Sequence, residues 1–334
     1  MLSVLVPVYN GGHDLERCLA AIADGTRQPE ELIVIDDAST DGSGALAKQL
    51  GARVVTLSGE PKGPANARNR GAMVASGDII VFVDADVAAH SDTLARLEQR
   101  MLTDDSLAGV FGSYDDAPTA PNLVSQYKNL QHHWVHQHGR RHANTFWAGC
   151  GAIRRDAFLA VGGYNPAYGR PAIEDIELGL RLTEHGLRIE LDRDIQCTHL
   201  KRWSLLTLLR ADILGRAVPW CREIARRGHA PHDLNLNDTA RWSGVLSWAM
   251  LLSLGASFWL TRLALVAFGC FTVLVLLNRS FYRFLWQQGG WRLGLAGVVL
   301  HLCYYLYSSA VFACVAAPGL AWRRLRATKR AQPS

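Results

Sequence analysis

Two aspartates directly after an apolar run have the spacing of a metal site. Residues 79–87 read IIVFVDADV, so Asp84 and Asp86 follow a stretch of strand-forming residues. Side chains at positions i and i+2 of an extended chain point the same way. Two carboxylates aligned in this manner suit a hard divalent cation, which takes oxygen ligands. The alternative is an ordinary polar loop after a strand, and the pair alone does not separate the two.

A second cluster of acids lies in residues 170–182, RPAIEDIELGLRL, which predict the start of a helix. Glu174, Asp175 and Glu177 occupy three of four consecutive positions. Acids in a first turn offset the helix dipole, whereas a single one of them could act as a general base. Glu177 has Arg181 four residues on, so dipole compensation or that ion pair is enough to explain it.

Strands and helices alternate through the first 90 residues, and the ends of these strands carry the aspartates described above. Val- and Ile-rich runs predict strands at residues 3–8, 31–35, 53–57 and 79–83, with helical patterns between them at 13–23, 43–50 and 64–75. The alternation predicts the α/β class, a mostly parallel sheet of βαβ units. Such sheets bind ligands at the carboxyl ends of their strands. The residues placed there are Tyr9, Asn10, Asp36, Asp37, Asp84 and Asp86.

A helix predicted from residues 63–72, GPANARNRGA, carries Arg68 and Arg70. A helix N-terminus beside two cations is suited to a phosphate. Exposed arginines on a helix are usually only solvated, so the segment supports a phosphate site without establishing one.

The order of these segments resembles the family 2 glycosyltransferases with the GT-A fold. The segments are VPVYN, VIDDASTDGS, ARNRGA, FVDAD, GCGAIRRDAFLAVGGY and EDIELGLRL. The resemblance covers roughly residues 2–200, and the set is specific although Asp-x-Asp alone would not be. It implies a Rossmann-like sheet with flanking helices and a nucleotide-diphospho-sugar lying across the strand ends.

The resemblance also implies a role for each residue on the donor side. Asp37 would hold the uracil or other base, with the backbone near Pro7 and Tyr9 beside it. Arg68 would lie near the donor phosphates. Asp84 would reach the ribose or a metal-bound water.

Mg²⁺ or Mn²⁺ is the cofactor that the resemblance implies, with Asp86 as a ligand and Asp175 as the general base. Several relatives add a metal-binding histidine some two dozen residues beyond the base, where His199 lies, although an isolated histidine after a strand is more often structural. A cation on the leaving diphosphate and a base on the opposite face permit one direct displacement, which inverts the anomeric centre. Lys201 and Arg202 would add charge near the diphosphate or face lipid headgroups.

The acceptor side is implied by the segment TFWAGCGAIRRDAF, which supplies Trp147 and Gly149, with Glu174 as a contact to an acceptor hydroxyl. Residues 129–142, NLQHHWVHQHGRRH, place His132 and His136 one helical turn apart, a spacing that could bind a metal. The segment holds no Asp or Glu. A basic, aromatic helix at the acceptor entrance or the membrane surface is therefore favoured over a zinc site.

Beyond residue 200 the sequence becomes amphipathic and then apolar. Leucines recur at helical spacing in residues 202–228, with Arg202, Arg210, Arg216, Arg222, Arg226 and Arg227 on the polar side. This pattern is typical of a helix in the membrane interface, and a helix packed on the catalytic domain is the alternative. Apolar stretches follow at 243–260, 263–277 and 293–320.

A membrane span needs about 20 apolar residues, so two or three spanning helices are expected, and three are favoured. Three spans leave the basic tail outside, against the positive-inside tendency. Two spans made from one long helix would bury Arg262. The basic loop at residues 278–292 prefers the cytosol and supports three.

Composition narrows the class of protein. The chain has 334 residues and a formal net charge of +5, with no basic and aromatic stripe in its first 190 residues, so no nucleic-acid partner is expected. Seven scattered cysteines without a CxxC pair predict neither a disulfide framework nor a zinc site and fit a reducing compartment. The start, MLSVLVPVYN, lacks a basic segment and predicts a buried strand rather than a signal peptide.

The predicted organisation has four parts. Residues 1–200 form the catalytic domain, with a nucleotide-sugar-binding half at 1–90 and an acceptor half at 91–200. An amphipathic interface segment at 201–241, a membrane domain at 242–320 and a basic tail at 321–334 follow.

The predicted function is an inverting, metal-dependent transfer of one sugar from a UDP-sugar to a lipid or lipid-linked acceptor. The predicted location is the cytosolic face of the inner membrane, with a multi-pass anchor. A polyprenyl-phosphate acceptor is the close alternative. A processive polysaccharide synthase is a second one, although GRAVPW lacks the glutamine of the Q-x-x-R-W motif of such enzymes. A non-catalytic nucleotide-sugar-binding protein would have no use for both Asp86 and Asp175.

Overall fold

The computed structural model describes residues 1–228 and 237–320, and the predicted basic tail at 321–334 lies outside them. The chain divides into two compact units. The N-terminal unit comprises Met1–Pro121 and Asn129–Trp203, and the C-terminal unit comprises Asn122–Lys128 and the described residues from Ser204 onward. The four-part organisation expected from the sequence stays a prediction.

The N-terminal unit is built on one mixed sheet. Its strands are β1 (Leu2–Val8), β2 (Glu31–Asp36), β3 (Arg53–Thr56), β4 (Ile79–Val83), β5 (Val87–Ala89), β6 (Leu107–Tyr114), β7 (His142–Ala143), β8 (Cys150–Arg154) and β9 (Arg188–His199). Their order across the sheet is β3-β2-β1-β4-β8-β6-β9-β5, with β7 paired to β9. The strands β3, β2, β1 and β4 run parallel, as do β6 and β9, whereas β8 is antiparallel to both of its neighbours. The prediction of a mostly parallel α/β sheet is confirmed.

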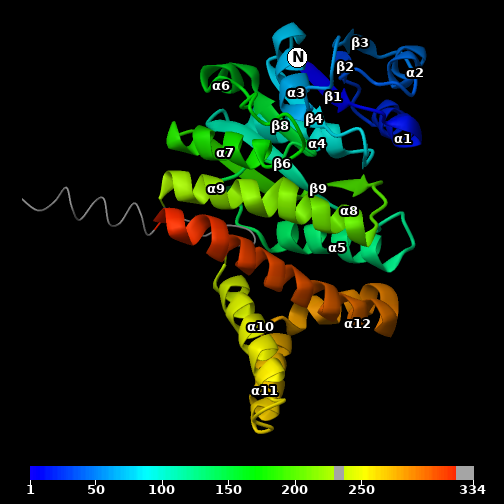
Figure 1. Ribbon diagram of the computed structural model, residues 1–334. Coiled ribbons are helices and arrows are strands. Elements are labelled where there is room, and N and C mark those ends of the chain that lie inside the picture. The colour runs from blue at the N-terminus through cyan, green and yellow to red at the C-terminus, as the bar shows by residue number, and fades with distance from the viewer. Residues whose placement is uncertain (229–236, 321–334) are drawn as a thin grey trace, which may run out of the picture. The chain divides into compact units, whose positions relative to one another are not determined.

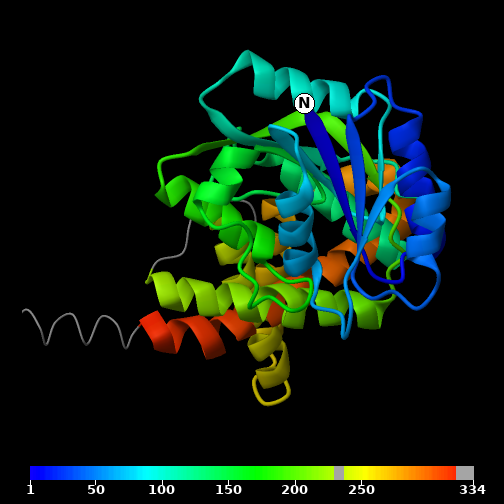
Figure 2. The same cartoon turned by 90° about the horizontal axis from the view of Figure 1, so that it is seen from above.

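Helices cover both faces of this sheet. They are α1 (Gly12–Ala23), α2 (Ser43–Gln49), α3 (Pro64–Val74), α4 (Thr93–Thr103), α6 (Arg155–Ala160) and α7 (Glu174–Glu184), together with most of α5 (Leu123–His138). Figure 2 shows α1 and α3 on opposite sides of β1 and β2.

Successive side chains of the central strands alternate between two cores, as the period of a strand requires. Val4 and Val6 belong to the core that α1 and α4 cover, and Leu5 belongs to the core under α3 and α7. Because β1, β2 and β4 are buried on both faces, only their carboxyl ends are left to present polar groups.

The C-terminal unit is helical. It contains α8 (Leu205–Arg210), the π-helix η1 (Ala211–Ala217), α9 (Val218–Arg227), α10 (Asp238–Ala256), α11 (Leu263–Leu277), α12 (Arg279–Val311) and the π-helix η3 (Phe312–Ala316). The prediction of a helical pattern in residues 202–228 is confirmed by α8, η1 and α9. In Figure 1, α10 and α11 form a hairpin that projects away from α12.

The helix α12 is broken near its start. Gly289 and Gly290 have non-helical backbone angles, and Gly290 has φ of 67°. That left-handed conformation is open to glycine without steric cost. The break separates the first turns of α12 from a longer helical stretch that runs from Trp291 through η3.

The expected two or three membrane spans reduce to one candidate. Within residues 1–228 and 237–320, Arg279–Leu320 is the stretch long and apolar enough to cross a membrane by length and composition. The helix α11 has 15 residues, about 22 Å at 1.5 Å per residue, against a hydrocarbon core about 30 Å thick. The 19-residue α10 carries Asp238 and Arg241 at its start, which shortens its apolar part. The prediction of a multi-pass membrane domain is therefore wrong by this measure.

Candidate active site

The acids predicted from the sequence gather around one buried arginine. Arg68 on α3 donates from one terminal nitrogen to Asp84 Oδ1 at 2.5 Å and from the other to Glu174 Oε1 at 3.1 Å. Its guanidinium lies 5.4 Å from the ring centroid of Tyr164. Arg68 and Glu174 are both about 95% buried. A single cation therefore joins the end of β4 to the start of α7, two segments about ninety residues apart in the sequence.

The two aspartates after β4 have different electrostatic surroundings. Burial raises the pKa of Asp84, and the charge of Asp86 raises it further against the opposing effect of Arg68. Burial also acts to raise the pKa of Asp86, but His199 and Lys201 outweigh it and hold that pKa well below its usual range. The Oδ2 atom of Asp86 lies 3.7 Å from His199 Nε2 and 3.5 Å from Lys201 Nζ. Asp86 is thus an ionised carboxylate at the sheet edge.

His199 is held in one orientation by its neighbours. Its Nδ1 atom lies 2.7 Å from Asn129 Oδ1, and its ring stacks on Tyr114 with a centroid separation of 4.3 Å. An amide oxygen can only accept a hydrogen bond, so Nδ1 carries a proton toward Asn129. The other ring nitrogen, Nε2, is on the side of the ring that faces Asp86. No sequence pattern singles out Asn129 or Tyr114.

The residues Asp86 and His199 fit a divalent cation by the chemistry of their donor atoms. Metal-binding histidines characteristically donate their second ring N–H to an outer partner, as His199 does to Asn129. An Asp86 carboxylate oxygen and the Nε2 atom of His199 face each other here, 3.7 Å apart. Across the described stretches no group of three or more His, Cys, Asp or Glu side chains is placed to hold a metal ion. The remaining ligands would therefore come from the donor diphosphate and water.

Asp175 sits at the start of α7, beside the pair formed by Arg68 and Glu174. Burial raises the pKa of Asp175 to about 7, and the negative charge of Glu174 adds to the effect. The charge of Arg68 and a hydrogen bond from Ile176 N, at 2.8 Å, oppose this rise. The N-terminus of α7 also acts to lower a carboxylate pKa. Desolvation exceeds the helix effect, and Asp175 is poised to exchange a proton near neutral pH.

The other two acids of α7 have structural partners. Glu174 accepts from Ala172 N at 2.8 Å through the oxygen that does not bind Arg68. Because Glu174 is buried and both of its oxygens accept hydrogen bonds, it is badly placed to bind the acceptor hydroxyl as the sequence predicted. Its contacts indicate that it holds Arg68 in position. Glu177 accepts from Arg181 Nε at 2.8 Å and from a terminal nitrogen at 2.9 Å. The ion pair predicted for Glu177 is confirmed.

The residues predicted to bind the base lie at the ends of β1 and β2. Pro7 is buried and pairs with Ile35, and Tyr9 is 52% exposed. Asp37 is buried, and its two oxygens accept from Lys62 N at 3.0 Å and Gly63 N at 2.7 Å. The Asp37 carboxylate therefore fixes the N-terminus of α3, and a base can reach only its remaining lone pairs.

Two non-glycine residues near this edge have left-handed backbone angles. Asn10 has φ of 52° and Ala38 has φ of 62°. Such angles are uncommon for residues with a Cβ and cluster at functional sites. Asn10 Oδ1 accepts from Thr40 N at 2.8 Å, which ties the loop after β1 to the loop after β2. The sequence suggested neither residue's conformation.

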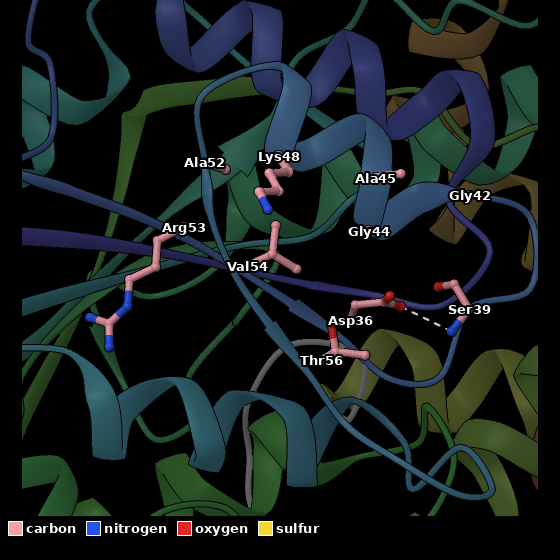
Figure 3. A pocket seen from close by; sticks show the side chains of 10 residues that line it. All are labelled: Asp36, Ser39, Gly42, Gly44, Ala45, Lys48, Ala52, Arg53, Val54 and Thr56. Carbon is pink, nitrogen blue, oxygen red and sulfur yellow. Dashed lines mark hydrogen bonds between the residues drawn. The ribbon is translucent and has the colours of Figure 1, made fainter.

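A separate hollow lies beside Asp36. Figure 3 shows it between α2 and the edge strand β3, and it encloses about 570 Å³. Asp36 Oδ1 accepts from Ser39 N at 2.9 Å. The side chains lining the hollow in the described chain include none of the residues predicted for donor, metal or acceptor, so its position does not identify the active site.

Trp147 and Gly149 lie in a loop that contacts Asp84 through the backbone. The half-buried Trp147 ring packs edge-on against Tyr114 at 4.6 Å. A Cβ at position 149 would come within 2.4 Å of that ring, so only glycine fits there. Gly149 O accepts from Asp84 N at 3.1 Å, which links this loop to the acid pair.

The histidines of α5 stack around Tyr114 and do not form a separate cluster. The rings of His132 and His136 lie 5.9 Å and 6.3 Å from the Tyr114 ring, and His133 Nδ1 lies 2.7 Å from Tyr114 O. Together with Trp147 and His199 they make one aromatic wall beside the ionised Asp86. The placement of this segment at the acceptor entrance or the membrane surface stays a prediction.

Comparison with known protein families gives two matches. The profile described as Glycosyl transferase family 2 matches residues 3–162. A second profile, the N-terminal domain of galactosyltransferase, matches residues 128–201.

The curated relatives are all matched over a part of their length. The glycosyltransferase GlyG of Streptococcus pneumoniae serotype 4 is 36% identical over 123 residues, which cover 35% of this chain and 41% of that protein. The uncharacterised glycosyltransferase YibD of Escherichia coli K12 is 37% identical over 107 residues, 31% of each chain. AglE of Haloferax volcanii is 30% identical over 139 residues, 39% of this chain and 46% of that protein. The chain thus spans less than half the length of these relatives.

Among solved structures, the mannosyltransferase PcManGT of Pyrobaculum calidifontis has a similar fold. It superposes with a TM-score of 0.57 at 17% identity and covers 93% of this chain and 86% of that one. At this identity the likeness shows the fold, a GT-A sheet followed by C-terminal helices, and the fold predicted from the sequence is confirmed.

Proposed function

Because residues 3–162 match the family 2 glycosyl transferase profile and the fold is GT-A, we propose that the protein transfers one sugar with inversion from a nucleotide-diphospho-sugar to a hydroxyl acceptor. The observation that carries the proposal is the division of the acids into two environments. Asp86 is held ionised, and Asp175 has a pKa of about 7. Titratable groups with pKa values pushed apart in one site divide the acid and base work of a reaction.

The proton step belongs to Asp175. In its ionised form it accepts the proton of the acceptor hydroxyl as that oxygen attacks the anomeric carbon. The bond from that carbon to the diphosphate oxygen breaks on the opposite face, so the configuration inverts. The pKa of about 7 permits Asp175 to release the proton to solvent after transfer at neutral pH.

The donor side is proposed along the ends of β1, β2 and β4. Asp86 and His199 would hold Mg²⁺ or Mn²⁺, and the ion would supply Lewis-acid stabilisation of the leaving diphosphate. Lys201, 3.5 Å from Asp86, adds a positive charge on the same side. Asp37, with Pro7 and Tyr9 beside it, would bind the base, and uracil is the proposed one. The PcManGT structure contains GDP-Man and Mn²⁺, which are ligands of the same two classes.

Arg68 has a role that differs from the one expected. Arg68 is committed to Asp84 and Glu174, so we assign it to fixing the distance between the metal side and the base side. Asp84, paired with Arg68, remains the proposed contact to the ribose or to a metal-bound water. Trp147 and Gly149 stay the proposed acceptor contacts.

A lipid or lipid-linked alcohol is the proposed acceptor class, because the second unit exposes a large apolar surface. The raised pKa of Asp175 favours a hydroxyl acceptor over a polyprenyl phosphate, which is largely ionised at neutral pH and needs no strong base. A single transfer is favoured over processive synthesis. The proposed location is the cytosolic face of the inner membrane.

The test is a product analysis with purified full-length protein. UDP-glucose, UDP-galactose, UDP-N-acetylglucosamine and GDP-mannose would be offered with Mn²⁺ and a membrane lipid extract, and the products analysed by mass spectrometry. A lipid product heavier by one sugar supports the proposal. A ladder of several sugars would favour a processive synthase, and nucleotide-sugar binding without any product would favour a non-catalytic protein.

A further inference from the structure

The stretch that is long enough to span a membrane runs alongside an amphipathic helix. Tyr307 of α12 donates to Asp212 Oδ2 of η1 at 2.7 Å. Near the other end, a Cβ on Gly319 would lie 2.7 Å from the Cβ of Ala225 in α9. A small core fills the space between these points, with Cys221, Ile224 and Ala316 at its centre. From the first contact to the second, the residue numbers rise in both helical segments. The two segments therefore run side by side in the same direction over roughly 20 Å, as Figure 1 shows.

The partner helix carries exposed arginines along this length. Arg210, Arg216, Arg222 and Arg226 are exposed on α8, η1 and α9. If the stretch from Trp291 to Leu320 crossed the bilayer, its parallel partner would carry these arginines into the hydrocarbon. An arginine at the centre of a bilayer is costly on insertion scales. This cost is avoided when the helix pair lies in the plane of the membrane surface.

The same two helices also expose apolar side chains, as an in-plane orientation needs. Leu206 and Leu214 of the amphipathic helix are 74% and 63% exposed. Trp291, Leu295 and Val299 recur at intervals of four residues along α12 and are all more than half exposed. A helix pair with arginines and an apolar side is suited to the boundary between headgroups and acyl chains.

The hairpin of α10 and α11 differs from this pair. It is apolar on all sides, and the tip residues Phe258 and Trp259 are 92% and 87% exposed. A helix that is apolar all round is typical of a membrane interior. The base of the hairpin is fixed to α12, because Asn278 Nδ2 donates to Ser243 Oγ at 2.9 Å and Tyr305 Oη donates to Asn278 Oδ1 at 2.8 Å.

We propose that the C-terminal unit is a monotopic membrane anchor. The α8–η1–α9 helix and the stretch Trp291–Leu320 lie in the interface, while the α10–α11 hairpin enters the bilayer and returns to the same side. This inference rests on the membrane attachment proposed above and not on the proposed reaction. The hairpin, about 22 Å along α11, stops short of the far side of a core about 30 Å thick. Arg262, exposed at the turn, extends its side chain toward the far headgroups.

Two native cysteines measure the tilt of the candidate span. Cys303 and Cys314 are exposed, and Cys270 in α11 is half-buried. In full-length protein with Cys270→Ser, either Cys303→Ser or Cys314→Ser would leave one exposed cysteine for a nitroxide label, beside the buried ones. The depth of the label in liposomes is read from oxygen and nickel collision rates. An in-plane helix places the two labels within a few ångströms of the same depth. A crossing helix separates them by about 16 Å, and that result would overturn the proposal.

The hairpin is tested at its tip in the same background. Phe258→Cys, with Cys270, Cys303 and Cys314 changed to serine, would be exposed to a membrane-impermeant maleimide on each side of sealed vesicles. We expect no labelling from the side opposite the catalytic unit. Labelling from that side would mean that the hairpin crosses the bilayer, and would overturn the monotopic arrangement. Flotation of the same protein with liposomes separates this failure from a failure of membrane attachment itself.

Discussion

The two units of this protein place their apolar and charged side chains in opposite ways. The N-terminal unit buries its apolar side chains in two cores and leaves incompletely paired acids at one edge of its sheet. The C-terminal unit exposes apolar side chains and buries an ion pair, in which Lys128 Nζ lies 2.8 Å from Asp212 Oδ1 with both side chains 4% exposed. The first pattern suits a domain in water, and the second suits a domain whose surroundings are partly lipid.

The number of partners of a buried carboxylate distinguishes a structural role from a catalytic one. Asp212 accepts from Lys128, Tyr307 and Arg216, so both oxygens of its carboxylate have partners. Asp175 accepts a hydrogen bond from a backbone N–H, and burial together with Glu174 raises its pKa to about 7. Strongly perturbed groups of this second kind cluster at functional sites.

The largest effect is expected for Asp175→Asn, which retains the shape of the side chain and removes the base. We expect the rate of sugar transfer to fall by about 10²–10⁴-fold, the usual contribution of a general base. Nucleotide-sugar binding, measured by isothermal titration with Mn²⁺ present, should change little. Full transfer activity with the true acceptor would contradict the assignment of Asp175 as the base.

The same substitution, aspartate to asparagine, in the C-terminal unit tests whether its buried ion pair is structural. Asp212→Asn leaves the buried Lys128 without its counter-charge, which we expect to cost about 3–5 kcal/mol of stability. Thermal unfolding in detergent would measure the loss. Arg216→Gln is the matched control, because Arg216 is 45% exposed and an exposed pair contributes about 0–1 kcal/mol. If Asp212→Asn unfolded at the wild-type temperature, the buried pair would not be structural.

Sequence patterns predicted the N-terminal unit well because its signals are local. The end of a strand follows from where an apolar run stops, and β4 begins and ends at the residues expected for it, Ile79 and Val83. The identities of Asp84, Asp86 and Asp175 followed from the resemblance. The contacts that hold the site together did not, because Arg68 meets Glu174 across more than a hundred residues, and Asn129 meets His199 across seventy. Pairings of this kind depend on the folded topology and leave no periodic trace.

The C-terminal unit was predicted less well for a related reason. Apolar length is readable from the sequence, so the three stretches were found where α10, α11 and α12 lie. Their number of crossings depends on how the helices turn and pair. The break at Gly289 and Gly290 and the parallel packing of α12 on η1 are tertiary features that a hydropathy pattern does not contain.

A smaller effect is expected at Asn129, whose acceptor oxygen fixes the proton of His199 on Nδ1. Asn129→Leu removes that acceptor, and we expect Mn²⁺ affinity in the presence of UDP to fall by about 10–100-fold, as for other second partners of metal-binding histidines. Asn129→Asp keeps an acceptor at the same position and should retain most of the affinity. Electron paramagnetic resonance of Mn²⁺ provides the measurement. Equal affinities in all three proteins would remove His199 from the metal site.

The smallest expected effect is on the pH dependence of transfer. Asp175 accepts a proton only when ionised, so the rate should rise with pH through its pKa of about 7. The charged groups that act on Asp175 are Glu174, Arg68 and Asp84. Glu174→Gln removes a negative neighbour, so we expect the acidic limb of the profile to move down by about one pH unit.

The control for this shift is another acid of the same helix. Glu177 is equally buried but is paired with Arg181, and it is absent from the groups that raise the pKa of Asp175. Glu177→Gln should therefore leave the acidic limb near pH 7 even where it lowers stability. If both variants moved the limb equally, the shift would come from loosening of α7, and the electrostatic link between Glu174 and Asp175 would be wrong. If neither variant moved the acidic limb of the pH profile, that limb would report the titration of a group other than Asp175.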